Sequence, residues 1–64
     1  MQFHENMLRL RTAAGLTQEQ AARNMGKLQG DWARWETGKR KPGCATMIQR
    51  IADALGAEVQ ELFK

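Results

Sequence analysis

The sequence predicts a small all-α fold. Apolar residues recur along it at helical spacings of three and four, and no segment alternates between apolar and polar residues as a half-buried strand does. Glycines follow four of these stretches, where a helix often ends in the left-handed conformation that glycine adopts at little cost: Gly15, Gly26, Gly38 and Gly56. Residues 1–64 suffice for one domain, and we expect a single compact domain of five helices.

The first helix is expected to occupy the segment before Gly15. Phe3, Met7, Leu10 and Ala14 follow one another at spacings of four, three and four residues. These spacings place all four side chains on one face of a helix, which we expect to pack on the core.

A second helix is predicted to begin after Thr17. The segment Thr17-Gln18-Glu19-Gln20 has the form of a capping box, in which each of its end residues bonds through its side chain to the backbone N–H of the other. We expect this helix to be short and to end near Asn24 or Met25. Its inward residues are small or apolar: Ala21, Ala22 and Met25.

The third predicted helix, from about Gln29 to Thr37, has two unlike faces. At about 100° per residue, Trp32 and Trp35 lie close together on the helical wheel, and we expect both indoles in the core. The opposite face carries small residues, one arginine and, at its leading edge, one glutamine: Gln29, Gly30, Ala33, Arg34 and Thr37. A merely solvated face would more often hold several Glu and Lys residues.

Pro42-Gly43 is expected to open a fourth helix. Its inward residues recur at spacings of three and four: Cys44, Met47, Ile48, Ile51, Ala52 and Leu55. On this pattern Cys44 is a small core residue. A last short helix, which contains Val59, Leu62 and Phe63, is expected to close over the bottom of the core.

Positive charge is concentrated in residues 1–41. These carry eight basic and four acidic side chains, a balance of +4, whereas residues 42–64 carry two basic and three acidic ones, a balance of −1. The uneven distribution indicates a surface for a polyanion, although charge alone leaves open a solvated basic surface without a partner.

The outward face of the third helix suits a nucleic-acid partner. Small residues allow close approach, while glutamine and arginine carry the paired polar atoms that hydrogen-bond the edges of adenine and guanine. Lys39, Arg40 and Lys41 follow directly and are placed to meet the phosphate backbone. The sequence therefore predicts a DNA-binding surface at this helix.

Several motifs with fixed spacing run through the chain: Leu16-Thr17-Gln18-Glu19-Gln20-Ala21-Ala22, Arg34-Trp35-Glu36, Gly38-Lys39-Arg40-Lys41-Pro42 and Ile51-Ala52-Asp53-Ala54-Leu55-Gly56. With Gly26, Gln29 and Trp32, they make the chain resemble the Cro/phage-repressor (xenobiotic-response-element-like) helix-turn-helix family from about Met7 to Phe63. The resemblance implies a five-helix lambda-repressor-like domain with its helix-turn-helix at about residues 17–37. It also implies binding of double-stranded DNA in the major groove and regulation of transcription.

The resemblance assigns roles to individual residues. Gln18 is similar to a family glutamine that braces a phosphate and the recognition helix. The DNA-binding set that the resemblance and the wheel together imply is Gln18, Lys27, Gln29, Gly30, Ala33, Arg34, Thr37, Lys39, Arg40 and Lys41. Arg11 and Glu36 match a pair that forms a buried, structural salt bridge in related repressors.

The chain departs from the family pattern just before the third helix. Lys27 and Leu28 stand where the family commonly has an apolar residue and then a Ser or Thr cap, so this helix is expected to lack a side-chain N-cap. Tryptophans at positions 32 and 35 replace the smaller aliphatic residues that are usual there.

On these grounds we expect a Cro-like repressor that binds a palindromic operator as a homodimer, with half-sites about one helical turn apart. Dimer contacts are expected from Val59, Leu62 and Phe63. Alternatives with the same fold are an antitoxin with a toxin as its partner, or a restriction-modification control protein. An alternative of another class is an adaptor that contacts proteins and not DNA. RNA polymerase is a further candidate partner.

We expect neither an enzyme nor a bound metal or cofactor, because no catalytic arrangement is evident. His4 has no Cys, Asp or His at ligand spacing, and the one cysteine, Cys44, has no partner for a disulfide within the chain. There is no run of about 18 apolar residues and no signal peptide pattern. We therefore expect a cytoplasmic protein that associates with the nucleoid.

Overall fold

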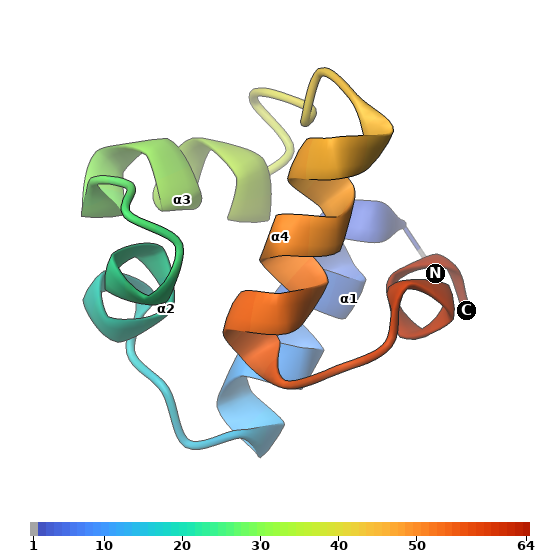
Figure 1. The fold of residues 1–64 in the computed structure, drawn as a ribbon, viewed down its shortest axis with the longest axis horizontal. Helices are drawn as coiled ribbons and strands as arrows, with labels where there is room; N and C mark the ends of the chain where they lie inside the picture. Colours follow the sequence, from blue (N-terminus) through green and yellow to red (C-terminus); the bar gives the residue numbers. More distant parts are fainter. Residues whose placement is uncertain (1) are drawn as a thin grey trace.

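The computed structural model describes residues 2–64. These form four α-helices and a final 3-10 helix (Figure 1): α1 (Phe3–Ala13), α2 (Gln18–Asn24), α3 (Gln29–Glu36), α4 (Ala45–Leu55) and η1 (Val59–Phe63). No strand occurs among residues 2–64, so the predicted all-α fold is confirmed. The last element is a 3-10 helix, a form that is used mainly in short pieces. Within the same residues, no helix is both long enough and apolar enough to cross a membrane.

The helices begin and end at signals that the sequence contains. Thr17 Oγ1 accepts a hydrogen bond from the Gln20 N–H at 3.1 Å, and Gln20 Oε1 accepts one from the Thr17 N–H at 2.9 Å, which completes the predicted capping box. The four helix-ending glycines all have a positive φ. At Gly38 (φ 79°) the missing side chain matters twice, because a Cβ there would also lie 3.1 Å from Nδ1 of His4 on α1.

The core lies where all five elements meet, and Trp32 is its largest fully buried side chain. Trp32 is fully buried and Trp35 nearly so, which confirms the prediction that both indoles face inward. Their ring centroids are 6.3 Å apart at an angle of 68°, an edge-to-face contact. The other large, fully buried apolar residues are Met7, Ile51 and Leu62.

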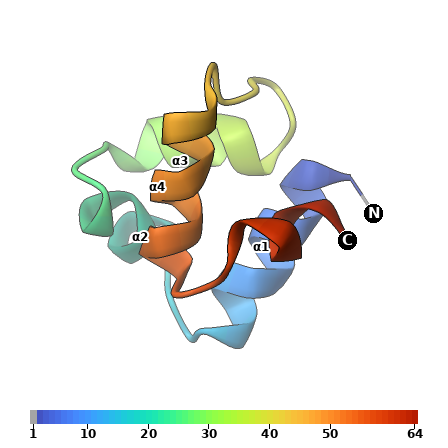
Figure 2. The same cartoon turned by 45° about the vertical axis from the view of Figure 1, so that its right-hand side comes forward.

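The end of the chain packs against its beginning. Asn6 is fully buried, and its Nδ2 donates to the carbonyl oxygens of Leu62 at 2.8 Å and Lys64 at 3.2 Å. The rings of Phe3 and Phe63 lie beside this contact with centroids 5.5 Å apart. As a result η1 runs alongside the start of α1, as two views of the ribbon show (Figures 1 and 2).

Two side chains also tie α2 to α4. Arg50 of α4 donates from Nη2 to the carbonyl oxygen of Met25 at 2.6 Å, and Asn24 donates from Nδ2 to that of Ala54 at 3.1 Å. Both bonds occupy carbonyl groups near helix C-termini, which lack partners within their own helices. The orientation of α2, and of α3 that follows it, is thereby fixed on the core.

Three predictions about buried residues were wrong. Ala14 was expected on the inner face of the first helix, but it is exposed and is the C-cap residue that follows the end of α1 at Ala13. Cys44 is exposed and is the N-cap residue of α4, because the helix begins at Ala45 and the backbone of Cys44 is still extended. Leu62 was expected at a dimer surface but is fully buried in the core of its own chain, so its side chain has no surface to offer a second copy. The remaining inward residues of α4 are half-buried at Met47 and Ile48 and buried at Ile51, Ala52 and Leu55.

Candidate nucleic-acid interface

The α2–turn–α3 unit turns one side of α3 outward. Trp32 and Trp35 hold the inner side in the core, and the opposite side is open to solvent (Figure 1). Of the five residues predicted for this outer face, four are exposed and Ala33 is half-buried. The face is therefore available to a partner over the full length of the helix.

Arg34 extends from the middle of the outer face of α3. Its side chain is 56% exposed, and Nη1 lies 3.1 Å from Oδ1 of Asp31, one turn earlier. Exposed ion pairs of this kind contribute about 0.5 kcal/mol or less within a helix. A guanine edge or a phosphate can therefore replace Asp31 as the partner of Arg34 at little cost.

Gln18 links the start of α2 to both ends of α3. Its Nε2 donates to Oε1 of Glu36 at 3.4 Å, and its Oε1 accepts from Nε2 of Gln29 at 3.4 Å. Gln29 is exposed in the first turn of α3, where the glutamine amide meets solvent. The bracing role that was expected of Gln18 toward the recognition helix is thus present in the free protein, and its role toward a phosphate is an untested prediction.

Glu36 anchors this network from inside the protein. Its carboxylate forms a two-pronged ion pair with Arg11, in which Nε and Nη2 each donate at 2.8 Å, and it also accepts a hydrogen bond from the indole N–H of Trp32. Burial raises the pKa of Glu36, but the hydrogen bonds from Arg11, Trp32 and Gln18 and the charge of Arg11 outweigh burial, so this pKa is lowered. Glu36 is therefore an ionised, structural residue.

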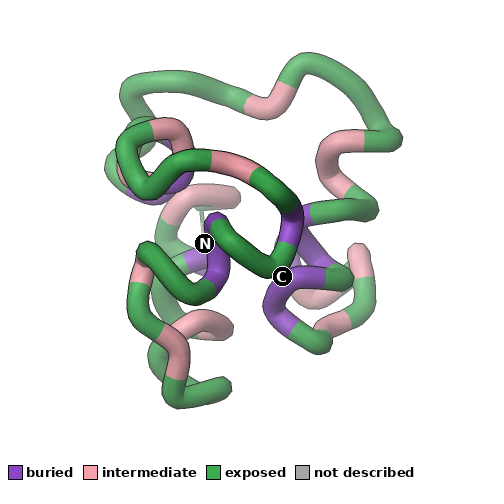
Figure 3. Tube along the Cα trace, turned by 60° about the vertical axis from the view of Figure 1, so that its left-hand side comes forward, coloured by how far each residue is buried: buried purple, intermediate pink, exposed green. Residues whose placement is uncertain are grey.

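The loop after α3 carries three consecutive cations. Residues 37–46 are exposed except for the half-buried Pro42, and the loop forms the outer rim of the molecule in Figure 3. Its first turn is held by the Thr37 hydroxyl, which donates to the Ala33 carbonyl at 2.8 Å, and by the Arg40 N–H, which donates to the Arg34 carbonyl at 3.1 Å. Lys39, Arg40 and Lys41 are thereby presented next to the end of α3.

The turn before α3 contributes one cation and one residue that sequence reasoning missed. Lys27 is half-buried there, next to Leu28, whose side chain is 77% exposed. Leu28 is also the N-cap residue of α3 and forms no capping hydrogen bond through its side chain, as its aliphatic nature dictates. A large apolar side chain exposed to water beside Gln29 is suited to contact a thymine methyl group. The position of Leu28 directly before the third helix was the feature of the sequence that could have indicated this role.

Among residues 2–64, no three His, Cys, Asp or Glu side chains come together in a group that could hold a metal ion. The exposed groups of the site are the amide of Gln29 and the guanidinium of Arg34 on α3, the ammonium and guanidinium groups of the flanking segments, and the apolar side chain of Leu28.

Comparison with known proteins identifies the arrangement. Residues 8–63 match the family model described as a helix-turn-helix domain. The structure is similar to the crystal structure of the restriction-modification controller protein C.AhdI from Aeromonas hydrophila, with a TM-score of 0.86 and 36% sequence identity over 95% of this chain and 91% of that one. A search of curated protein sequences found no significant match.

Proposed function

The chain belongs to the helix-turn-helix family of Cro- and phage-repressor-like regulators and is a DNA-binding transcriptional regulator, and from this premise we propose that it is a repressor that binds a two-fold symmetric operator as a homodimer. We expect it to act at the DNA in the cytoplasm, without catalytic activity and as a single domain of residues 1–64.

The outer face of α3 is the observation that supports this proposal most directly. Gln29 and Arg34 extend from it, while Gly30 and Ala33 between them leave room for the floor of the major groove. In this role Gln29 pairs with an adenine and Arg34 with a guanine, since these are the bases whose edges match an amide and a guanidinium. Leu28 contacts a neighbouring thymine methyl group.

Residues around α3 would bind the sugar–phosphate backbone on both sides of the groove. Gln18 and Lys27 approach one strand from the start of the helix-turn-helix, and Thr37 with Lys39, Arg40 and Lys41 approaches the other from its end. Such contacts supply much of the affinity and set the register, whereas the side chains of α3 set the sequence preference.

The dimer contact is proposed to involve η1. Phe63 is 59% exposed and Val59 is half-buried, so both retain apolar surface that a second copy can cover. A contact there leaves α3 free on each protomer, and two protomers related by a two-fold axis then place their recognition helices in successive major grooves.

Control of a restriction-modification system is the regulatory context that the comparisons favour. The similarity to C.AhdI extends over 95% of this chain and 91% of that one, so it includes η1, the proposed dimer contact, as well as the helix-turn-helix. An antitoxin would require a toxin as a stoichiometric partner. An adaptor would more often display a large apolar anchor on the outer face of α3, where this chain has Gly30 and Ala33.

Selection of bound sites from a randomised DNA pool tests the proposal, followed by gel shifts with the selected duplex between 50 and 200 mM salt, about the range over which phosphate contacts weaken strongly. We expect enrichment of an inverted repeat with half-site centres about 10 base pairs apart. Enrichment of a single half-site would contradict the homodimer, and absence of any shift would favour the adaptor.

A further inference from the structure

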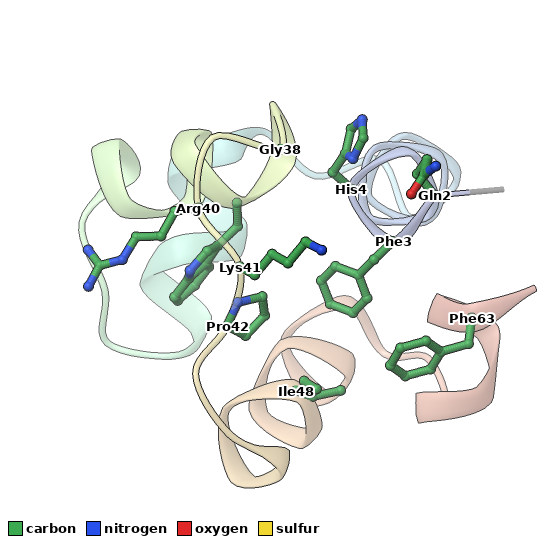
Figure 4. Close-up of a pocket in the computed structure, with 10 residues that line it drawn as sticks. Gln2, Phe3, His4, Gly38, Arg40, Lys41, Pro42, Ile48 and Phe63 are labelled. Carbon is green, nitrogen blue, oxygen red and sulfur yellow. The ribbon is translucent and has the colours of Figure 1, made fainter.

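A second concave surface lies apart from the outer face of α3. It is a cavity of about 330 Å³ between the start of α1, the α3–α4 loop, α4 and η1 (Figure 4). Its walls include Phe3, Trp35, Lys41, Pro42, Ile48 and Phe63. We propose that this cavity binds a small aromatic carboxylate and that the bound molecule lowers the affinity of the α3–α4 loop for DNA.

The walls of the cavity are apolar and aromatic. The rings of Phe3 and Phe63 are tilted at 47° to each other with centroids 5.5 Å apart, and Figure 4 shows both facing the same space as Pro42 and Ile48. Phe63 remains 59% exposed, so the aromatic wall is open to solvent on one side. A flat ring can enter from that side and bury surface against several side chains at once.

The charge inside the cavity determines which aromatic compounds fit. Lys41 runs along the cavity toward Phe3, whereas the guanidinium of Arg40 points away from it (Figure 4). His4 lies at the rim against Gly38, and the lining residues include no Asp or Glu. Lys41 is exposed and no lining carboxylate pairs with it, so its ammonium group favours an anion, with which it forms a charge-assisted hydrogen bond.

The volume limits the size of the occupant. Cavities for small molecules in proteins range from about 300 to 1,000 Å³, so this one is near the lower end. It suits one aromatic ring with a short side chain that ends in a carboxylate. A ligand of this size binds with modest affinity, on the order of 0.1–1 mM.

The consequence for DNA rests on the proposed function. Lys41 is one of the three cations proposed to contact the phosphate backbone, and Gly38 belongs to the same loop. A carboxylate held by Lys41 inside the cavity competes with a phosphate outside it for the same ammonium group. Binding of the small molecule and binding of DNA therefore oppose each other through one side chain, and by linkage each weakens the other by the same factor.

Phenylacetate is the probe for the test, with phenylacetamide as its uncharged analogue. Chemical shifts of the isotope-labelled protein are followed during titration in the absence of DNA. We expect phenylacetate to shift the backbone amide signals of Gly38 and Lys41 and the ring signals of Phe3 and Phe63, and phenylacetamide to bind at least fivefold more weakly. Signals around the Gln49–Asp53 pair on the outer side of α4 serve as an internal reference and should not move.

Two variants of the same loop separate the cavity from the general positive charge. Lys41→Gln removes the ammonium group that enters the cavity, whereas Lys39→Gln removes one that does not line it. We expect about a tenfold loss of phenylacetate affinity in Lys41→Gln, as for loss of one charge-assisted hydrogen bond, and no loss in Lys39→Gln. Equal losses in both, or equal binding of phenylacetamide, would overturn the proposal.

A second copy of the chain is the competing occupant. Phe63 is also proposed at the dimer contact, so the proposal requires that the dimer leaves the mouth of the cavity uncovered. If a neighbouring protomer instead fills the cavity, the same signals shift with protein concentration alone and phenylacetate does not bind, which would overturn the proposal. A gel shift with and without phenylacetate completes the test: binding without an effect on DNA contradicts the coupling only, and absence of DNA binding in both arms contradicts the proposed function while leaving the cavity result intact.

Discussion

Glu36 shows at the scale of one residue how the fold and the interface depend on each other. Its carboxylate accepts hydrogen bonds from α1 through Arg11, from α2 through Gln18 and from its own helix through Trp32. It lies on the buried side of α3, yet one of its partners, Gln18, is itself bonded to the exposed Gln29. The pattern of donors leaves no buried side-chain nitrogen or oxygen unpaired within residues 2–64.

We therefore expect Glu36→Gln to reduce the free energy of unfolding by about 3 kcal/mol or more, because it leaves the Arg11 charge partly buried without its counter-ion. Unfolding in urea, followed by tryptophan fluorescence, measures the change. Glu19→Gln is the matched control, since Glu19 forms only an exposed pair with Arg23 at 3.6 Å, and it should change stability by less than about 0.5 kcal/mol. Equal effects would contradict the structural role of Glu36.

The same carboxylate makes stability depend on pH. The pKa of Glu36 is lower in the folded protein than in the unfolded chain, so the unfolded chain takes up its proton first as pH falls. The stabilisation is complete above the unfolded pKa, about 4.3, and is lost as pH falls through the folded pKa. Urea unfolding at pH 7, 5, 4 and 3 should show a steep loss in the native protein and a shallower one in Glu36→Gln.

Arg34 is proposed to contact a base and Lys39 the phosphate backbone, so variants of the two residues should have different effects on binding. Arg34→Ala should cost about 1–3 kcal/mol on the selected operator and relax the preference at one base pair in each half-site. Lys39→Ala should weaken binding to all duplexes alike and reduce the salt dependence by about one counter-ion. Binding curves on the operator and on variants at each base pair measure both effects. A uniform loss in Arg34→Ala would assign Arg34 to the backbone instead.

At the scale of the element, α3 is an intrinsically weak helix that the core holds in place. It has eight residues, no side-chain N-cap and a glycine in its first turn. Isolated helices of this length are marginal in water, so α3 depends on the two tryptophans for its stability. The uncapped N-terminus at Leu28 and the glycine at position 30 both lie at the end of α3 that faces the proposed operator. There the apolar side chain of Leu28 can contact a base, and the absence of a side chain at Gly30 allows a base to approach closely.

Leu28→Ser tests whether stability was given up here for recognition. A serine at the N-cap should stabilise the protein by about 1 kcal/mol, which urea unfolding would detect. The same change should weaken operator binding and remove the difference in affinity between operators with thymine and with uracil at the contacted position, because uracil lacks only the methyl group. Retention of that difference would show that another residue contacts the methyl group.

The elements themselves could be predicted because their signals are local. The glycine stops, the Thr17 capping box and the inward tryptophans depend on residues within a few positions of one another. The full burial of Asn6, and of Leu62 within the predicted last helix, could not be found in this way, since it depends on a contact between the two ends of the chain. The local sign of this contact was Asn6 itself, a polar residue on the inner face of α1. Cys44 fitted the apolar period of α4 but precedes the first residue with helical backbone.

At the scale of the whole molecule, apolar surface is distributed over opposite ends. Leu28 is exposed at the start of α3, while Phe63 is exposed on η1 next to the start of α1. Leu28 is proposed to contact DNA and Phe63 a partner protomer. The proposed DNA-binding surface and the proposed dimer contact therefore use different side chains.

Phe63→Ser is expected to raise the dimer dissociation constant about tenfold, since removal of an exposed aromatic anchor from an interface costs on the order of 1–2 kcal/mol. Sedimentation at several concentrations measures it. Leu8→Ser is the matched control, because Leu8 is similarly exposed on α1 but lies on neither η1 nor α3. An equal loss in both variants would show that the dimer forms elsewhere.

The hydrogen bond between Gln18 and Glu36 also determines the orientation of the exposed side-chain amide of Gln29. A carboxylate has only lone pairs to offer, so Gln18 must turn its NH₂ toward Glu36 and its oxygen toward Gln29. Gln29 must then direct its own NH₂ toward Gln18, which leaves its oxygen and its second hydrogen free and in a known order along the groove. In the proposed complex, the order in which Gln29 presents its acceptor and its donor to a nucleobase is thus set by the charge of Glu36, which lies on the buried side of α3.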